Sequence, residues 1–155
     1  MTVKVKKKIL KTLGKKRLYM NTQEQEAYDF LYNTMNSYTS ISNITFNELI
    51  DISHYIEINK NDYICKSNEF QNSFFFVNKG LLRTYIINEK GKEYNKIFFD
   101  EGTFPGSMVS LLKNEPSYFE IQAIEKCQLI EIDFKKYREL LIKNHDLKLF
   151  QIYYL

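Results

Sequence analysis

Apolar residues recur with two different periods along the chain, and each period predicts a different type of element. Over residues 23–38 the period is close to 3.6, which predicts an amphipathic helix. Its apolar positions are Ala27, Phe30, Leu31, Met35 and Tyr38. Thr22 is the predicted N-cap, because Gln25 follows three residues later. A second capping box over residues 45–48, Thr-Phe-Asn-Glu, predicts a short helix that ends at Asp51.

The middle of the chain changes to a strand pattern. Short apolar or alternating runs lie between turn sequences such as Asn59-Lys-Asn-Asp62, where Asn and Asp tolerate the left-handed conformation. The predicted strands are residues 55–58, 63–66, 74–77, 82–87, 93–99, 119–124 and 129–132. Short strands that turn every 8–12 residues are typical of a sandwich, barrel or jelly roll. Helices flank these strands and do not alternate with them, which disfavours a parallel α/β fold.

The end of the chain returns to helical spacing. One helix is predicted with Asp133 as its cap and Phe134, Tyr137, Leu140 and Leu141 on one face, and residues 145–155 predict another. In the second helix Leu147, Phe150 and Tyr154 follow the 3–4 spacing of a coiled-coil seam. We therefore predict that these three residues form a dimer interface and that the protein is a homodimer.

These patterns give a mainly β fold class with flanking helices. The predicted organisation is a basic, disordered extension over residues 1–20, helices over 21–52, a β-roll over 53–133 and C-terminal helices over 134–155. The length of 155 residues suits one domain. No apolar run approaches the roughly 18 residues that a membrane span needs. Two cysteines exclude a disulfide scaffold and a four-cysteine metal site, and together with the lack of a secretion signal they predict a cytoplasmic protein.

Basic residues concentrate at the start of the chain. Residues 1–17 carry eight Lys or Arg and no acid, whereas the rest of the chain carries 14 basic and 19 acidic residues. This segment is compatible with a phosphate-binding arm, a targeting peptide or a solvated tail. A start of translation at Met20 would remove it altogether. The mildly acidic remainder argues against nucleic-acid binding by the body of the protein.

One segment between the strands has the pattern of a ligand site. It runs from Phe104 to Ser117, and we call it the cassette segment. Gly106 allows a close approach of the backbone, and Ser107–Leu112 can form about one and a half helical turns. A helix N-terminus presents free N–H groups to an anion. A plain connecting loop explains the same residues equally well.

Several motifs in order resemble the cyclic-nucleotide-binding-like sensor domain of the Crp/Fnr transcription regulators, in the branch common in Bacteroidetes. They are Phe74-Phe-Phe-Val-Asn-Lys-Gly80, Asn88-Glu-Lys-Gly-Lys-Glu93, Phe99-Asp-Glu-Gly-Thr-Phe-Pro-Gly106, Ile121-Gln-Ala123 and residues 129–137. The resemblance implies a double-stranded β-helix, or jelly roll, with N-terminal helices and the start of a dimerisation helix. It also implies that DNA is bound only through a C-terminal helix-turn-helix domain, which this chain lacks. The chain is then a fragment, a truncated product or a stand-alone sensor.

The resemblance also assigns the ligand residues. Its glycine matches Gly106, but its ribose-binding Glu falls at Ser107 and its phosphate-binding Arg falls at Ser117, followed by Tyr118. Loss of the Arg costs roughly 1.5–3 kcal/mol of phosphate binding. We therefore predict weak or absent cAMP binding, and a pocket that is empty or holds a different small effector. The predicted ligand-binding residues are Gly106, Ser107, Met108, Val109, Ser117 and Tyr118.

Other chemistries have no residues to support them. Cys65 and Cys127 are far apart and are interpreted as buried, inert strand residues. His54 and His145 are the only histidines, too few for the metal site of a cupin, and neither is marked as a haem ligand. We find no nucleophile elbow or P-loop. The sequence thus predicts no catalytic residue, metal or cofactor. The alternative to a regulator sensor is a stand-alone interaction module without DNA binding.

Overall fold

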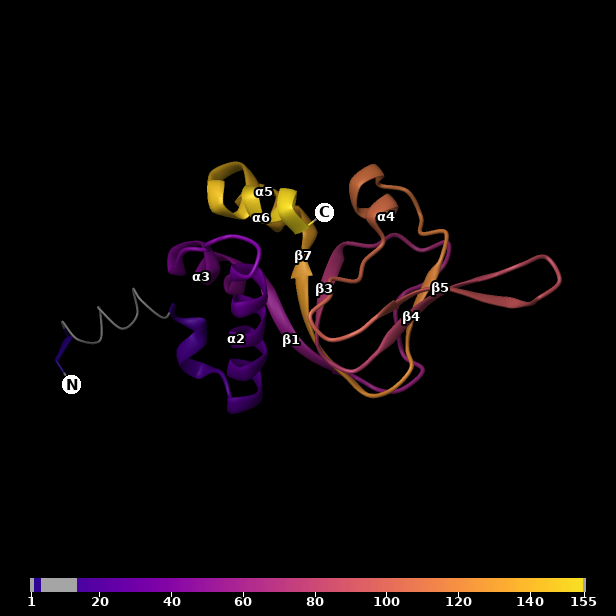
Figure 1. The fold of residues 1–155 in the computed structure, drawn as a ribbon, viewed down its shortest axis with the longest axis horizontal. Helices are drawn as coiled ribbons and strands as arrows, with labels where there is room; N and C mark the ends of the chain where they lie inside the picture. Colours follow the sequence, from indigo (N-terminus) through magenta and orange to yellow (C-terminus); the bar gives the residue numbers. More distant parts are fainter. Residues whose placement is uncertain (1, 4–13, 155) are drawn as a thin grey trace. The chain divides into compact units, whose positions relative to one another are not determined.

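The computed structural model describes residues 2, 3 and 14–154, and within them two compact units can be distinguished. One unit combines the two ends of the chain, Met1–Ser53 and Lys135–Leu155, and is helical. The other unit, His54–Phe134, is built mainly of strands. Figure 1 shows the elements of both. The predicted mainly β fold with flanking helices is confirmed. Among the described residues no helix has the length and apolar character that crossing a bilayer requires.

In its described residues, the helical unit holds one short 3-10 turn and four longer α-helices. They are η1 (Lys16–Tyr19), α2 (Thr22–Asn36), α3 (Asn43–Asp51), α5 (Phe134–Lys143) and α6 (His145–Tyr154). Both N-terminal helices begin earlier than predicted. Asn21 caps α2 by accepting the Glu24 N–H at 2.9 Å, and Ser42 caps α3 by accepting the Thr45 N–H at 3.1 Å. The predicted caps Thr22 and Thr45 are therefore wrong, because a side chain closer to the true start already satisfies the free N–H groups.

The end of the basic extension is ordered. Lys16 donates through Nζ to the carbonyls of Ile50 (3.0 Å) and Ser53, and Arg17 forms an ion pair with Asp29. Burial lowers the pKa of Lys16, and the two carbonyls compensate its ammonium for lost water. Residues 16–19, which the prediction includes in the basic extension, form the 3-10 turn η1. The basic residues among positions 4–13 lie outside the described part.

One carboxylate joins the two ends of the chain inside the helical unit. Asp146 accepts the Ser42 N–H at 2.9 Å, the Thr45 hydroxyl at 3.0 Å and the Leu147 N–H at 2.9 Å. Burial tends to raise the pKa of Asp146, but these hydrogen bonds outweigh it and lower the pKa below its usual value. The start of α3 is thereby held against the start of α6.

Seven strands form two sheets in the other unit. They are β1 (Ser53–Ile58), β2 (Tyr63–Cys65), β3 (Ser73–Lys79), β4 (Leu82–Ile87), β5 (Glu93–Phe99), β6 (Glu120–Ala123) and β7 (Cys127–Asp133). The strand order is β1-β7-β3 in one sheet and β2-β6-β4-β5 in the other. The pairs β3–β7, β2–β6, β4–β5 and β4–β6 are antiparallel. Helix α4 (Met108–Lys113) lies between β5 and β6, inside the cassette segment.

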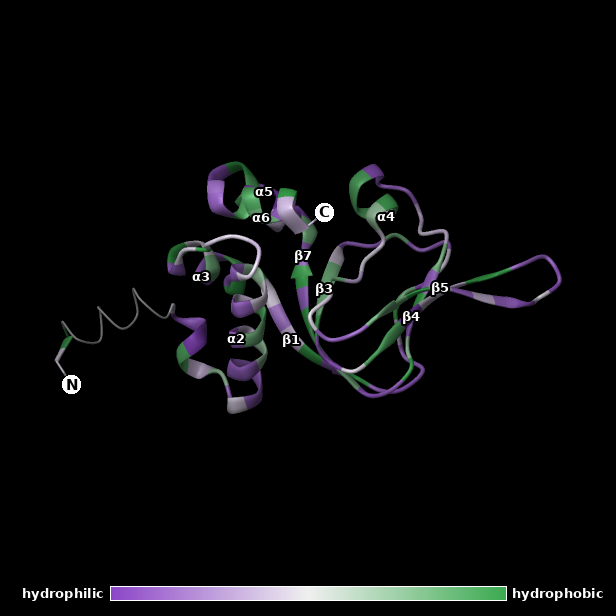
Figure 2. Ribbon diagram, viewed as in Figure 1, coloured by the Kyte–Doolittle hydropathy of each residue, from purple (hydrophilic) through white to green (hydrophobic). Residues whose placement is uncertain are grey.

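Inward-facing apolar residues of both sheets make the core of the roll. They are Cys65, Phe75, Val77, Leu82, Ile121, Ala123, Cys127 and Leu129. Figure 2 shows the matching contrast between apolar strands and hydrophilic turns, such as the tip of the β4–β5 hairpin. Both cysteines are free and buried, as predicted, and burial raises the pKa of both thiols. They are therefore poor nucleophiles at neutral pH.

Two turns need a special backbone conformation. Asn61 has a φ of 74°, which confirms the left-handed turn predicted between β1 and β2. Gly80, between β3 and β4, has a φ of 104°, and a Cβ there would lie 2.6 Å from Cys127 Sγ. Only glycine fits this position, because both the backbone angle and the packing exclude a side chain.

We predict that Asp146 gives the helical unit an acid-sensitive stability. A lowered folded-state pKa means that its contribution is complete above the unfolded pKa of about 4 and is lost as pH falls through the folded pKa. The substitution Asp146→Asn should lower the free energy of unfolding at pH 7 by about 1–3 kcal/mol. It should also flatten the pH dependence below about pH 4. Urea unfolding followed by circular dichroism measures both effects. The control is Glu139→Gln, on the exposed side of α5, and equal stability of the two variants at pH 7 would contradict the assignment.

Candidate functional site

The cassette segment contains the short helix that the sequence predicts. Helix α4 begins after Ser107 and ends at Asn114, which has a left-handed φ of 55°. The Leu111 N–H donates to the Ser107 carbonyl at 2.9 Å, and the Asn114 N–H donates to the Ser110 carbonyl at 3.0 Å. The first turn is thus closed by the backbone, and no side chain caps its N-terminus.

Gly106 serves packing within the roll. A Cβ at this position would lie 2.9 Å from Phe74 Cβ, closer than real side chains approach. The close approach predicted for a ligand is therefore made by Phe74 of strand β3. Glycine is needed here irrespective of any bound molecule.

Ser107 carries a buried hydroxyl without a partner. Its side chain is fully buried, and its Oγ has no hydrogen-bond partner among the described residues. An unpaired buried hydroxyl costs about 1–3 kcal/mol. This orphaned oxygen lies where the resemblance places a ribose-binding Glu. It supplies one neutral hydroxyl in place of a charged acceptor.

Ser117 makes its hydrogen bonds inside the protein. Its hydroxyl donates to the Phe119 carbonyl at 2.8 Å and accepts the Cys65 thiol at 3.2 Å. Its backbone N–H donates to the Glu69 carbonyl at 2.9 Å, and its carbonyl accepts the Asn68 N–H at 2.8 Å. With an exposed fraction of 0%, this residue offers no donor to an anion.

The remaining predicted ligand residues lie at or near the surface. Met108 is exposed on α4, and Val109 is partly buried. Tyr118 is 66% exposed, and its hydroxyl donates to Glu115 at 3.0 Å. This bond to a carboxylate raises the pKa of Tyr118. Tyr118 also lines a hollow of about 120 Å³, together with Ser67, Tyr85, Ile86, Ile87, Phe119 and Glu120.

Two carboxylates act on Cys65 near the end of the cassette segment. Burial raises the pKa of the Cys65 thiol, the Ser117 hydrogen bond opposes that rise, and the carboxylates of Glu120 and Glu69 add to it. Glu120 also accepts a hydrogen bond from the Tyr85 hydroxyl at 2.5 Å. The cyclic phosphate of a nucleotide carries a negative charge and needs a cation here. These residues do not fit such a group.

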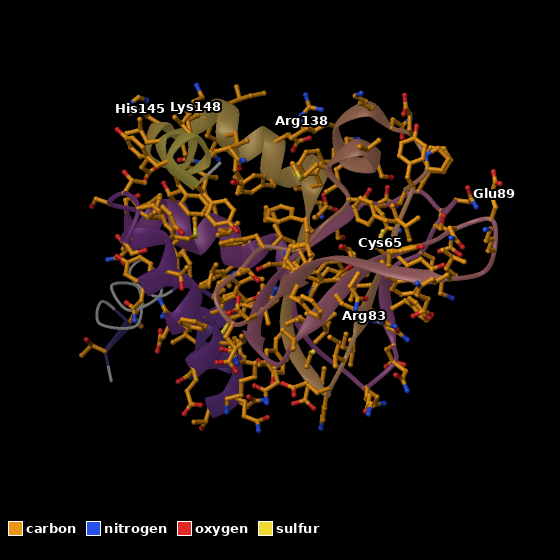
Figure 3. All side chains as sticks on the ribbon, turned by 45° about the vertical axis from the view of Figure 1, so that its right-hand side comes forward. Cys65, Arg83, Glu89, Arg138, His145 and Lys148 are labelled. Atoms are coloured by element: carbon orange, nitrogen blue, oxygen red, sulfur yellow. The ribbon has the colours of Figure 1, made fainter. Side chains whose placement is uncertain are left out.

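Sequence reasoning missed the loop that covers the cassette segment, residues 66–72. Besides its two backbone bonds to Ser117, it donates the Gln71 N–H to Ser110 Oγ at 2.8 Å. The signal that could have revealed it is the turn-forming pair Ser67-Asn68, where Asn68 has a φ of 64°. A cleft of about 310 Å³ opens beside this loop and beside Cys65. Figure 3 labels Cys65 on the strands of the roll. Its lining includes Lys66, Glu69, Gln71, Asn72 and Glu131.

The predicted dimer seam has partners within the chain. Leu147 and Phe150 have exposed fractions of 0% and 4%, so they have almost no surface for a second copy. The rings of Tyr38, Phe150 and Tyr154 pack on one another, with centroids 5.4–5.9 Å apart. Their spacing along α6 is explained by this internal contact. A dimer interface at these residues stays a prediction.

The described residues contain no cluster of side chains that could bind a metal ion. In residues 2, 3 and 14–154, no group of three His, Cys, Asp or Glu side chains is arranged to hold an ion. His54 and His145 are exposed, and Figure 3 shows His145 on the helical unit.

Comparisons with known proteins agree with this architecture. Over 75 residues the chain is 27% identical to the cAMP-activated global transcriptional regulator CRP of Salmonella typhimurium, and the match covers 48% of this chain and 36% of CRP. The sensor domain of the transcriptional regulator DNR from Pseudomonas aeruginosa shares the fold, with a TM-score of 0.65, 20% identity and coverage of 84% of this chain and 83% of that one. The regulatory subunit of a cAMP-independent protein kinase A from Trypanosoma brucei also shares it, with a TM-score of 0.65, 15% identity and coverage of 84% and 51%.

The family comparison covers more than half of the chain. The model of the cyclic nucleotide-binding domain matches residues 55–144, which include all of the roll except the beginning of β1. The resemblance to the Crp/Fnr type of this domain is confirmed at this level. The chain belongs to the cyclic nucleotide-binding domain family.

Proposed function

We propose that the chain is the ligand-sensing domain of a cytoplasmic Crp/Fnr-type transcriptional regulator and that it does not bind cAMP with high affinity. The observation that carries this proposal is the neutral, internally bonded Ser117 at the position of the phosphate-binding Arg. The sensor role follows from the family and from the similarity to CRP, a regulator described as cAMP-activated. The loss of cAMP affinity follows from the residues of this chain.

Phosphate capture depends on a charge-assisted hydrogen bond from a cation. At the end of the cassette segment the carboxylates of Glu69 and Glu120 act on the Cys65 thiol, and Ser117 itself carries no charge. A cyclic phosphate placed there would lose water, meet like charge and gain no salt bridge. Any effector bound by this segment is therefore expected to lack a phosphate. A shared fold is compatible with this, since the Trypanosoma brucei neighbour is described as cAMP-independent.

Dimerisation is part of the proposal, because a regulator of this type needs two copies to read a two-fold DNA site. Leu147 and Phe150 are buried, whereas Ile152 and Tyr153 of α6 are exposed apolar residues that a second copy could contact. A small-molecule effector would act by binding one of two states of such a dimer more tightly.

We predict no saturable binding of cAMP at concentrations up to about 1 mM in isothermal titration calorimetry, which corresponds to less than about 4 kcal/mol of binding free energy. CRP, titrated in parallel, is the positive control. The physical reason is the missing cation at Ser117. A low-micromolar dissociation constant for this chain would refute the proposal.

A second candidate function is a stand-alone interaction or sensor module without DNA binding. The match to CRP corresponds to 36% of that protein and does not separate this candidate from the regulator. The two candidate functions predict different masses and different DNA binding for the native gene product. The regulator proposal predicts a product heavier than the 18.6 kDa of this chain that is retained on DNA. Intact-mass spectrometry of the protein from its own cells, with a DNA pull-down, tests it. A product of 18.6 kDa that is not retained on DNA would favour the stand-alone module.

A further inference from the structure

The outer face of the sheet β2-β6-β4-β5 carries a third hollow, whose lining differs in charge from that of the other two. Its volume is about 210 Å³, and we call it the Arg83 hollow. Its lining residues are Lys60, Asn61, Arg83, Asn95, Phe98, Gln122, Ala123 and Ile124. They include two cations, three carboxamides and no carboxylate. The two hollows nearer the cassette segment each include a carboxylate in their lining.

Arg83 is held in one orientation. Its Nη1 donates to Asn95 Oδ1 at 3.0 Å, and its Nη2 donates to Gln122 Oε1 and to Glu93 Oε2, both at 3.1 Å. Its guanidinium also lies over the ring of Tyr85, 4.6 Å from the centroid. A guanidinium fixed in this way loses little further entropy when it binds a ligand. Figure 3 marks Arg83 on the strands of the roll.

The same bonds use only part of the donor capacity of Arg83. The side-chain oxygens of Asn95 and Gln122 accept from Arg83, so the NH₂ group of each amide points away from the guanidinium. Gln122 donates through Nε2 to the Asn61 carbonyl at 3.2 Å, which links the left-handed turn after β1 to the sheet. Three Nη hydrogens of Arg83 are used by these acceptors, and its Nε–H and one Nη1–H remain for a ligand within the described structure.

Strand pairing brings these groups together. Gln122 of β6 and Phe98 of β5 are both register partners of Arg83 on β4, so the three form one row across the sheet. Lys60 adds a second, exposed cation from the turn that precedes β2. Phe98 and Ile124 provide apolar walls for a small carbon skeleton.

We propose that the Arg83 hollow binds a small free oxyanion, either a carboxylate or a phosphate. Lys60 would neutralise its charge, and the remaining Nε–H and Nη1–H of Arg83 would donate to its oxygens. Glu93 pairs with Arg83 from outside the hollow and leaves Lys60 as the uncompensated charge. The site is independent of the function proposed for the cassette segment.

The test is a titration with inorganic phosphate and with succinate at constant ionic strength, followed by NMR of the backbone amides and of the Asn, Gln and Arg side chains. We expect saturable shifts at Asn61, Arg83, Asn95 and Gln122. The variant Arg83→Gln should weaken binding by about tenfold or more, and Lys60→Gln should weaken it about threefold to tenfold. Lys60 makes no hydrogen bond or ion pair within the described structure, so its replacement tests the charge without disturbing the fold.

Lys148→Gln is the matched control, because Lys148 is an equally exposed lysine on helix α6 of the helical unit (Figure 3). It should bind both probes as the wild type does. The proposal is overturned if Lys60→Gln and Lys148→Gln bind equally, or if the shifts fall on Gly106–Val109 instead. It is also overturned if neither anion saturates at about 10 mM.

Discussion

The hydrogen bonds of Ser117 determine what the cassette segment can do. Its backbone pairs with Asn68 and Glu69, so the loop over residues 66–72 is fixed across the end of the segment. Its hydroxyl joins the Phe119 carbonyl to the Cys65 thiol, which is part of the buried core. A short neutral side chain can be buried in this way because every polar atom finds a partner. A cation could not, since its charge would need water or an anion.

The surroundings of the cassette segment and those of the Arg83 hollow therefore differ in charge. Acids gather near the cassette segment, where Glu69 and Glu120 help to raise the pKa of Cys65. Cations gather on the outer face of the sheet, where Arg83 is ordered by stacking and by three hydrogen bonds. A domain with this distribution would reject an anion at the position where its family resemblance expects one. It would accept an anion in the Arg83 hollow, where the hydrogen-bond donors are in place.

Periodicity alone predicted the order of the elements, because a period of 2 or 3.6 reflects which side of each element is buried. It could not predict partners. The spacing of Leu147 and Phe150 is the same for a seam between copies and for internal packing, and only the fold shows that Tyr38 covers Phe150. Cap positions were missed for a local reason, since Asn21 and Ser42 compete with the predicted caps for the same N–H groups.

The two candidate sites also differ in how far the sequence could predict them. The cassette segment is contiguous, so a motif could locate it, although its sequence could not show that the glycine packs against Phe74. The Arg83 hollow draws Lys60, Arg83, Asn95 and Gln122 from four separate segments. Only the pairing of β4 with β5 and β6 brings them together. No spacing along the chain signals such a site.

The central claim is that a neutral cassette segment holds no cyclic nucleotide, and one NMR experiment addresses it at the residues themselves. Backbone amides of Gly106–Val109 and Ser117 are followed while cAMP is added to about 5 mM, a concentration that would populate even a millimolar complex. We predict that these amides do not move along a saturating curve. A saturating shift confined to Gly106–Val109 and Ser117 would contradict the claim, because it would show a cyclic phosphate bound where no cation receives it.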